Sequence, residues 1–382
     1  MTVVMTWLAL FSLTAVVLLL PMLPALAEWR RPRDATPLHI DAQDALDPDL
    51  LARRFAQRLA QALREGADRL GDQALVRLPE VPPGAWPLNA DERSRGHSDR
   101  VWSVAGSAQL PEGIAFHAEV AADTDLHTAA GRTCRALLAG QRLWLSPGTQ
   151  VLRWAHAPQV QVADDAVLQG RCTADALLAV QGRASFQLLH APQLQFGPPG
   201  APAQPLPDTL PEPEAHLPIA WHPVTGRGVA QGPLQMPPGR RWQGDLVGLA
   251  TVQLGEGCHA RGSLKARRAL VVGAGSRIDG NVIAEGAITL GEGCVVQGVV
   301  ASETSVRLGR GCRIGAPGRP ATVTAPRIDV AAGVQVHGTV WAVEAGWAEG
   351  LAGPVQALQT PAEATDALPP TAPLAAAWKA AI

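Results

Sequence analysis

The C-terminal part of the chain repeats a pattern of apolar, polar and glycine positions every 18 residues. Five glycines follow one another at this spacing and a sixth comes after 22 residues: Gly239, Gly257, Gly275, Gly293, Gly311 and Gly333. An apolar residue stands three positions before each of them: Met236, Leu254, Val272, Leu290, Leu308 and Val330. A fixed period over this length indicates stacked copies of one structural unit.

Each 18-residue unit contains three six-residue pieces. Within a piece, small or apolar side chains two positions apart lie on one side of a short strand, and a glycine or polar residue then makes a turn. Three strands and three corners form a triangular coil, and coils stacked at the strand spacing of about 4.8 Å bury their inward side chains. The pattern predicts an all-β fold, a triangular β-helix (β-solenoid) of about 18 residues per coil over residues 233–345. The longer last step coincides with Ala316–Pro320, a predicted insertion at a corner.

A looser version of the pattern, with a period near 17, runs through residues 101–197. Its anchor positions are Leu110, Thr128, Leu145, Val162, Ala179 and Phe196, and apolar residues precede the later anchors by two positions: Leu126, Leu143, Val160, Leu177 and Leu194. The corner column holds Gly113, Gly131, Gly148 and Gly182, and Asp165 and Pro199 interrupt it. We predict degenerate β-helical coils here, with a separate small β-sandwich as the alternative.

The first 27 residues are mostly apolar, and no charged residue occurs from Thr2 to Ala27. About 20 apolar residues are enough to cross a bilayer, and the basic residues Arg30, Arg31 and Arg33 follow directly. This pattern predicts an uncleaved transmembrane anchor over 1–27, placing the protein in the inner (cytoplasmic) membrane as a single-pass protein with its bulk in the cytoplasm. The alternative is an exported protein with a signal peptide cleaved after Ala27, where Ala25-Leu26-Ala27 has the small-x-small form of a processing site.

The remaining segments connect these parts. Residues 28–100 are predicted to be a linker that contains a short amphipathic helix near 47–70, started by Asp47-Pro48-Asp49 and apolar at every fourth residue from Leu51 to Leu63. Its basic face would lie on anionic lipid, or the helix would simply cap the domain that follows. Residues 198–232 are proline-rich and predicted to be a linker, and 346–382 are predicted to be a disordered tail.

Composition narrows the function classes. Only 17% of the residues are charged, and 38 Gly and 33 Pro argue against a mostly helical enzyme. The net charge of -2 provides no positive field for nucleic acid, which we do not expect as a partner. The five cysteines form no CxxC pair and fit reduced thiols in a cytoplasm. Three of them share one column with Ser276, and we interpret them as inward core residues and not as metal ligands: Cys258, Cys294 and Cys312.

A six-residue period is also typical of the left-handed β-helices of hexapeptide-repeat acyltransferases. Those enzymes need a histidine base at a coil corner and a loop over the substrate groove. Within the regular coils the pattern offers His259 and His337, with no such loop beside either. The glycine pairs Gly255-Glu256-Gly257 and Gly273-Ala274-Gly275 recur at coil corners and lack the ending of a phosphate loop. We therefore expect no catalytic residue, no metal and no cofactor.

The C-terminal repeat resembles the bactofilin family, the polymer-forming cytoskeletal proteins of bacteria. The resemblance covers residues 233–342 and is clearest in the segments 252–266 and 288–294. It implies a right-handed triangular β-helix of about six coils that assembles without nucleotide into non-polar filaments through its two ends. It also implies attachment to the inner membrane and recruitment of cell-wall or polarity proteins. If residues 101–197 stack on this helix, they would cover one of those ends.

The last coil carries the expected contact between copies. It ends in Val340-Trp341-Ala342-Val343, and no charged run blunts this edge before Glu344. We predict self-association through Val336, Val340, Trp341 and Val343, and a membrane-anchored, nucleotide-independent scaffold that positions envelope or polarity factors. The alternatives are a β-helical acyltransferase and an exported envelope structural protein.

Overall fold

The computed structural model describes residues 2–23, 30, 47–79, 86–198, 211, 217–222 and 227–350. The chain divides into two compact units, Met1–Asp47 and Pro48–Ile382. In the first unit, α1 (Thr2–Leu19) is followed by the short 3-10 helix η1 (Leu20–Met22). The second unit contains every strand of the described residues.

The prediction of a membrane anchor over residues 1–27, and with it the single-pass location in the inner membrane, is wrong. Among the described residues no helix is both long and apolar enough to cross a bilayer. The regular helix ends at Leu19, and Pro21 falls in the tighter turn that follows. Its 18 residues give about 27 Å at 1.5 Å per residue, against a hydrocarbon thickness of about 30 Å. The cleavage position after Ala27 lies outside the described residues.

The second unit confirms the β-solenoid. It has about 13 turns spaced about 18 residues apart, which form two consecutive segments of the chain. Arm 1 is residues 69–196, and its strands are β1 (Arg69–Leu70), β2 (Gln73–Leu78), β3 (His97–Ser98), β4 (Val101–Val104), β5 (Ala108–Gln109), β6 (Ala115–Ala122), β7 (Asp125–His127), β8 (Thr133–Ala139), β9 (Arg142–Leu145), β10 (Gln150–Val162), β11 (Ala166–Val180) and β12 (Ala184–Phe196).

Arm 2 is residues 219–348, and most of its strands are short and pair in three parallel ladders, while β13 pairs antiparallel with β14. Its strands are β13 (Ile219–His222), β14 (Arg227–Ala230), β15 (Leu234–Met236), β16 (Arg241–Trp242), β17 (Asp245–Gly248), β18 (Val252–Leu254), β19 (His259–Ala260), β20 (Leu264–Ala266), β21 (Leu270–Val272), β22 (Arg277–Ile278), β23 (Val282–Ala284), β24 (Ile288–Leu290), β25 (Val295–Val296), β26 (Val300–Ser302), β27 (Ser305–Leu308), β28 (Arg313–Ile314), β29 (Ala321–Val330) and β30 (Gln335–Ala348).

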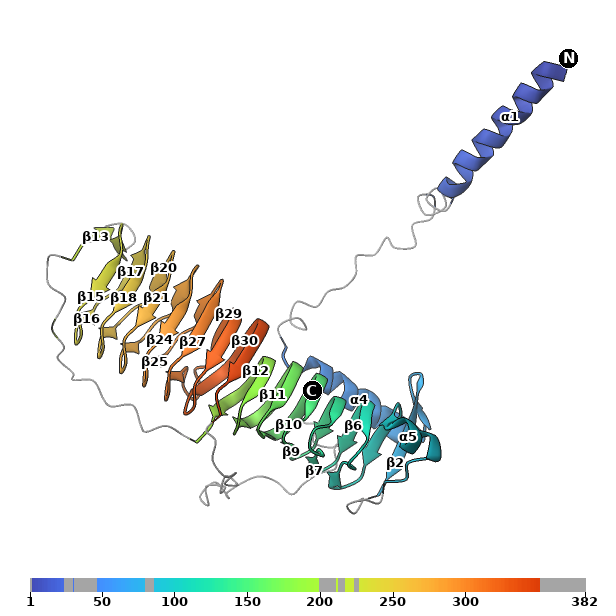
Figure 1. Cartoon of the computed structure of the whole chain (residues 1–382), viewed down its shortest axis with the longest axis horizontal. Helices are drawn as coiled ribbons and strands as arrows, with labels where there is room; N and C mark the ends of the chain where they lie inside the picture. Colours follow the sequence, from blue (N-terminus) through green and yellow to red (C-terminus); the bar gives the residue numbers. More distant parts are fainter. Residues whose placement is uncertain are drawn as a thin grey trace. The chain divides into compact units, whose positions relative to one another are not determined.

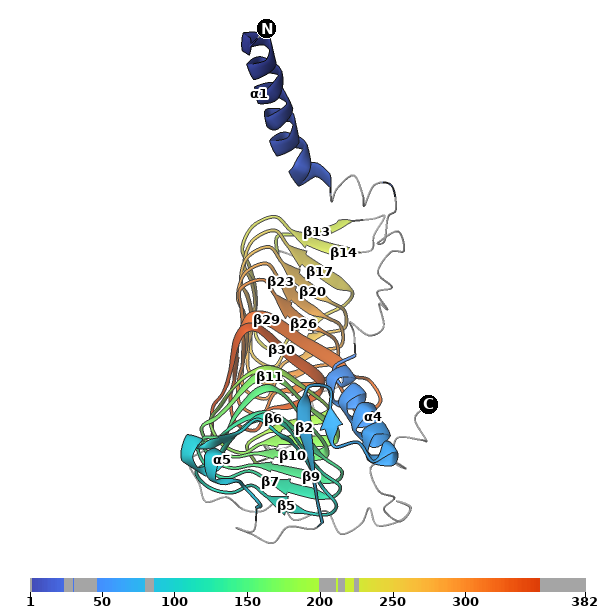
Figure 2. The same cartoon turned by 90° about the vertical axis from the view of Figure 1, so that its right-hand side faces the viewer.

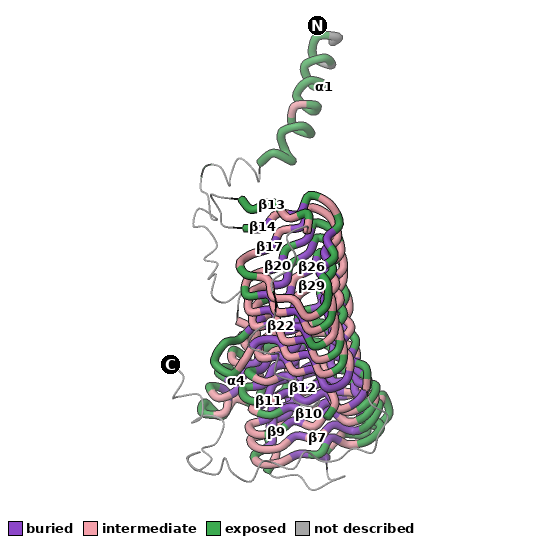
Figure 3. Tube along the Cα trace, turned by 90° about the vertical axis from the view of Figure 1, so that its left-hand side faces the viewer, coloured by how far each residue is buried: buried purple, intermediate pink, exposed green. Residues whose placement is uncertain are grey.

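The predicted vertical register of arm 2 is confirmed. Leu254 pairs with Val272, which pairs with Leu290, and that residue pairs with Leu308 on the next coil. Along the strands, buried residues alternate with residues of higher exposure (Figure 3). One set of side chains therefore fills the interior. The insertion at 316–320 lies between β28 and β29, where a turn is closed by a bridge between Ala316 and Arg319.

At the corners of arm 2, two sets of vertically aligned glycines have different structural roles. Gly275 has a φ angle of +65°, in the left-handed region, and a Cβ placed on it would meet no atom within 4 Å. On Gly273, a Cβ would lie 2.5 Å from the backbone nitrogen of Glu256 on the preceding coil. The first column therefore makes the turn, and the second lets neighbouring coils approach.

We expect Gly273→Ala to destabilise the protein more than Gly275→Ala. Gly275→Ala forces an alanine into a left-handed conformation and costs about 1–2 kcal/mol, whereas Gly273→Ala drives two backbones apart and costs about 3 kcal/mol. Urea unfolding followed by circular dichroism measures both free energies. Equal losses at the two positions would contradict the separation of these roles.

Arm 1 follows the same three-sided path with irregular corners. Register shifts occur within β10, β11 and β12, and on one coil they move two predicted columns by a residue. Leu178 pairs with Val160 and Leu194, and Val180 takes the anchor position that the sequence pattern gave to Ala179. Asp165 replaces the corner glycine with a φ angle of 57°, and Gly182 does not have a positive φ angle.

The predicted amphipathic helix is α4 (Leu50–Glu65), which ends at Gly66 and not near Leu70–Gly71. It lies along the flank of arm 1 and does not cap an end (Figure 2). Phe55 packs on Trp154 with a ring-centroid distance of 5.4 Å. The buried residues of α4 form a second apolar cluster with outward side chains of β4, β6, β8 and β10. The apolar face of this helix is thus satisfied within the chain.

The two arms meet through their last coils. β12 and β30 pair antiparallel from Ala184↔Ala348 to Gln195↔Gln335, along all three sides of the coil. The chain therefore passes from this junction, at Phe196, to the opposite end of arm 2, at β13, before the second stack begins (Figure 1). The interior is one continuous apolar cluster across the junction.

The three cysteines of arm 2 point inward, and each is fully buried. The Sγ atoms of Cys258, Cys294 and Cys312 donate to backbone carbonyl oxygens at 3.1–3.2 Å. Ser276 holds the same column, accepting from the Cys258 N–H and donating to the Gly255 carbonyl. These residues are part of the core.

Candidate self-association surfaces

The end of arm 2 at which the sequence pattern placed self-association is covered by the chain itself. Val336 and Val340 are buried, and they pair with Leu194 and Leu189 of β12. Trp341 and Val343 remain on the outside, 49% and 58% exposed. The edge that was expected to receive a second copy is thus already paired within the chain. Self-association stays a prediction, and a surface other than this edge would have to carry it.

Histidines fix the register of the junction. The Nδ1 atom of His190 lies 2.8 Å from the hydroxyl oxygen of Thr339, and burial lowers the pKa of His190 although Asp49 and Asp175 act in the opposite direction. His337 Nδ1 donates to the backbone carbonyl of Pro192 at 2.8 Å. His337, considered above as a possible catalytic base, therefore serves the contact between the arms.

The outer end of arm 1 is closed by an aromatic plug. Trp86 is 3% exposed and packs edge-on against Trp102 and Phe116, at centroid distances of 5.1 and 5.6 Å. Its indole N–H donates to the backbone carbonyl of Gln109 in β5 at 2.7 Å. The plug thus covers the core of the first coil and occupies an acceptor at its strand edge.

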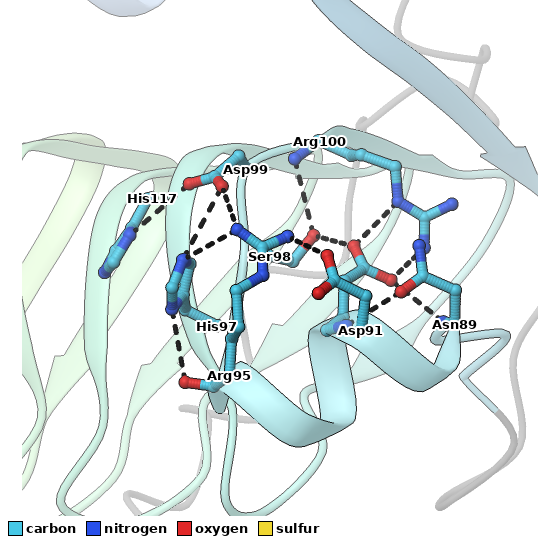
Figure 4. A network of polar contacts seen from close by, with 9 residues as sticks. Asn89, Asp91, Arg95, His97, Ser98, Asp99, Arg100 and His117 are labelled. Carbon is cyan, nitrogen blue, oxygen red and sulfur yellow. Dashed lines mark hydrogen bonds and ion pairs between the residues drawn. The ribbon is translucent and has the colours of Figure 1, made fainter.

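A short helix, α5 (Ala90–Arg95), completes this cap. Asn89 and Glu92 form a capping box, in which each side chain accepts the backbone N–H of the other residue. Glu92 is 2% exposed and accepts from Ser98 at 2.6 Å and from Arg100. Burial alone would raise the pKa of Glu92, but these hydrogen bonds lower it further than burial raises it. Figure 4 shows how this network ties α5 to the first coil.

The sequence pattern assigned residues 28–100, apart from the helix near 47–70, to a linker, and so missed the cap. The signal that identifies it is local: Asn89 followed three residues later by Glu92 is a capping-box pattern. Trp86 carried no comparable signal, since one aromatic residue in a proline-rich segment does not indicate what it covers.

The outer end of arm 2 is the more open one. β15 pairs with β18 and with no second strand among the described residues. β13 lies antiparallel on β14 and carries Trp221, which is 56% exposed. Trp242 lies over Gly228, where an added Cβ would be 2.4 Å from the indole ring. Part of the core is therefore covered here: β13 covers β14, and the Arg241 N–H of β16 donates to the Pro211 carbonyl. In the part of the chain that is described, the outer edge of β15 remains accessible.

His259, the other residue weighed for acyltransferase chemistry, is engaged in an ion pair on the outside of the stack. Its Nε2 lies 2.8 Å from Oδ2 of Asp279. The other carboxylate oxygen of Asp279, Oδ1, accepts from Nε of Arg277 at 2.8 Å. Partial burial raises the pKa of Asp279, but the two partners outweigh it and the pKa is lowered. This arrangement gives His259 a structural partner in Asp279.

Comparisons with known proteins found no match: no family model, curated protein or solved structure matches the chain.

Proposed function

We propose that the protein is a nucleotide-independent, self-assembling scaffold of the bactofilin type, whose copies pair through the outer end of arm 2. The observation that carries the proposal is the β12–β30 junction. Two coils of this chain pair edge to edge and antiparallel on all three sides of the stack, with apolar residues continuous across the contact. Coils of this sequence are therefore chemically suited to end-to-end pairing with another copy.

The end chosen for this contact follows from what covers each terminus of the stack. α5, Trp86 and the capping box occupy the outer end of arm 1. At the other end, Leu234 N–H donates to Thr251 and Met236 accepts from Gly255, so both residues face β18. Alternate residues of a parallel strand bond to opposite neighbours, which directs the backbone N–H of Gln235 away from β18. An edge of this kind invites a further strand.

Gln235→Pro tests the proposal without disturbing the fold. Gln235 is exposed, and proline at an edge position removes only an N–H that points away from the stack. We expect the full wild-type chain, without nucleotide, to sediment as an assembly of two or more copies, and Gln235→Pro to sediment as a monomer with unchanged β-sheet circular dichroism. Gln235→Ala keeps the N–H and should assemble like wild type.

A monomeric wild-type chain at tens of micromolar would overturn the proposal, as would assemblies that Gln235→Pro leaves intact. Negative-stain images distinguish pairs of rods from long filaments. Addition of ATP or GTP should change neither the size nor the yield of the assemblies, and a nucleotide requirement would also contradict it.

A further inference from the structure

A group of two histidines and one aspartate lies beside the cap of arm 1, apart from the surfaces described above. His97 is in β3, Asp99 follows that strand, and His117 is in β6 on the next coil. Because the strand alternates and Ser98 faces inward, His97 and Asp99 both point outward. The registers His97↔Ala115 and Ser98↔Phe116 then bring His117 level with Asp99.

The distances in this group suit a transition-metal ion. His97 Nε2 lies 3.6 Å from Asp99 Oδ2, and His117 Nδ1 lies 3.4 Å from Asp99 Oδ1 (Figure 4). All three ligand atoms lie within 4.8 Å of one another. Ligands bound to zinc at about 2.1 Å in a tetrahedron are about 3.4 Å apart, so small rotations of the rings close the site. Both imidazoles are partly exposed, which gives an ion direct access to them. Their rings are stacked, with the centroids 4.5 Å apart.

The proton positions on His97 also match those of a metal ligand. Arg95 Nη1 lies 3.3 Å from His97 Nε2, and because a guanidinium only donates, Nε2 is the acceptor. The proton is therefore on Nδ1, which donates to the backbone carbonyl of Arg95 at 3.3 Å. Metal-binding histidines characteristically donate their second ring N–H to such a carbonyl, which fixes the orientation of the ring.

The guanidinium of Arg95 occupies the position that a bound metal ion would take. Its guanidinium contacts both His97 Nε2 and Asp99 Oδ2 at 3.3 Å, and on its other side it pairs with Asp91 at 2.6 Å. A bound ion and this guanidinium would compete for the same lone pairs. Arg95 is 43% exposed and keeps Asp91 as a partner when it leaves.

We propose that His97, Asp99 and His117 form a zinc-class divalent metal site that joins the first two coils of arm 1, with Arg95 as its built-in competitor. Two imidazole nitrogens and one carboxylate oxygen are ligands that Zn²⁺ favours. The remaining coordination position is open to water. The site is independent of the proposed self-assembly, because it lies at the capped end.

Zinc binding by the full chain tests the site, measured by competition with a chromophoric chelator. Asp49, His156 and Asp175 form a second group of potential ligands, so the readout is the difference between variants and not the total zinc. We expect His117→Ala and Asp99→Asn each to bind one zinc ion fewer per chain than wild type. The melting temperature of wild type should rise with zinc, and that of His117→Ala should rise less.

Arg95→Ala tests whether Arg95 competes with the metal ion for these ligands. It keeps all three ligands and removes the competing charge, so we expect about fivefold tighter binding, corresponding to about 1 kcal/mol for an exposed ion pair at 1.4 kcal/mol per factor of ten. Equal zinc stoichiometry in wild type, His117→Ala and Asp99→Asn would overturn the site. Unchanged affinity in Arg95→Ala would overturn the role of Arg95.

Discussion

Val340→Asp is expected to lower the free energy of unfolding by about 3–5 kcal/mol, because it places an unpaired charge in the interior of the junction. Val340 is fully buried and lies between Leu189 of arm 1 and Val323 of the preceding coil. No cation stands in register with it on either neighbouring strand. Guanidinium unfolding gives the free energy, and limited proteolysis reports whether the arms separate.

Val343→Asp provides the matched control for this variant. It is the same chemical change three residues further along β30, at a side chain that is 58% exposed. Its cost should remain within about 0.5 kcal/mol. Similar losses for the two variants would show that the junction does not stabilise the solenoid. Opening the junction also frees two coil edges, so Val340→Asp should form larger assemblies than wild type.

Trp86→Ala should cost about 3–5 kcal/mol and uncover the outer end of arm 1. The indole is 3% exposed and fills the mouth of the core against Trp102 and Phe116, and its loss also leaves the Gln109 carbonyl without this donor. We expect a lower melting temperature together with a new, concentration-dependent association through this end. Sedimentation velocity detects the association.

Trp221→Ala is the comparison for the plug. Trp221 is also near an end of the stack but is 56% exposed, so its removal should change the melting temperature little. A Trp86→Ala protein with wild-type stability would contradict the plug. Loss of stability without new association would mean that α5 and the capping box suffice to close the end.

The sequence predicts arm 2 well because its corners are regular. A left-handed glycine at each turn keeps the spacing at 18, so the alignment of Leu254 with Val272 is readable from the pattern alone. The alignment of residues in arm 1 is harder to predict from the sequence, since register shifts in β10, β11 and β12 allow coils of different length to share one stack. The pattern consequently placed Leu177 and Ala179 in columns that Leu178 and Val180 occupy.

Three features had no adequate signal along the chain. The antiparallel junction joins residues about 150 apart through a proline-rich connection, and local periodicity does not encode which way the second stack runs. The apolar N-terminal segment has the composition of an anchor, but composition does not show that the helix ends at Leu19. The group of His97, Asp99 and His117 depends on which residues neighbouring coils bring level, and it escaped notice because His97 and Asp99 fell in a presumed linker while His117 fell in the predicted coils.

The tail-to-tail arrangement has a consequence for synthesis on the ribosome. Arm 1 is complete once Phe196 has emerged, but the strand that shields β12 ends at Ala348, about 150 residues later. At roughly 5–20 residues per second, the edge of β12 stays uncovered for on the order of ten seconds or more. During that interval the β12 edge of a nascent chain can pair with the terminal strand of a neighbour further along the same messenger, which makes domain-swapped products the characteristic folding error of this architecture.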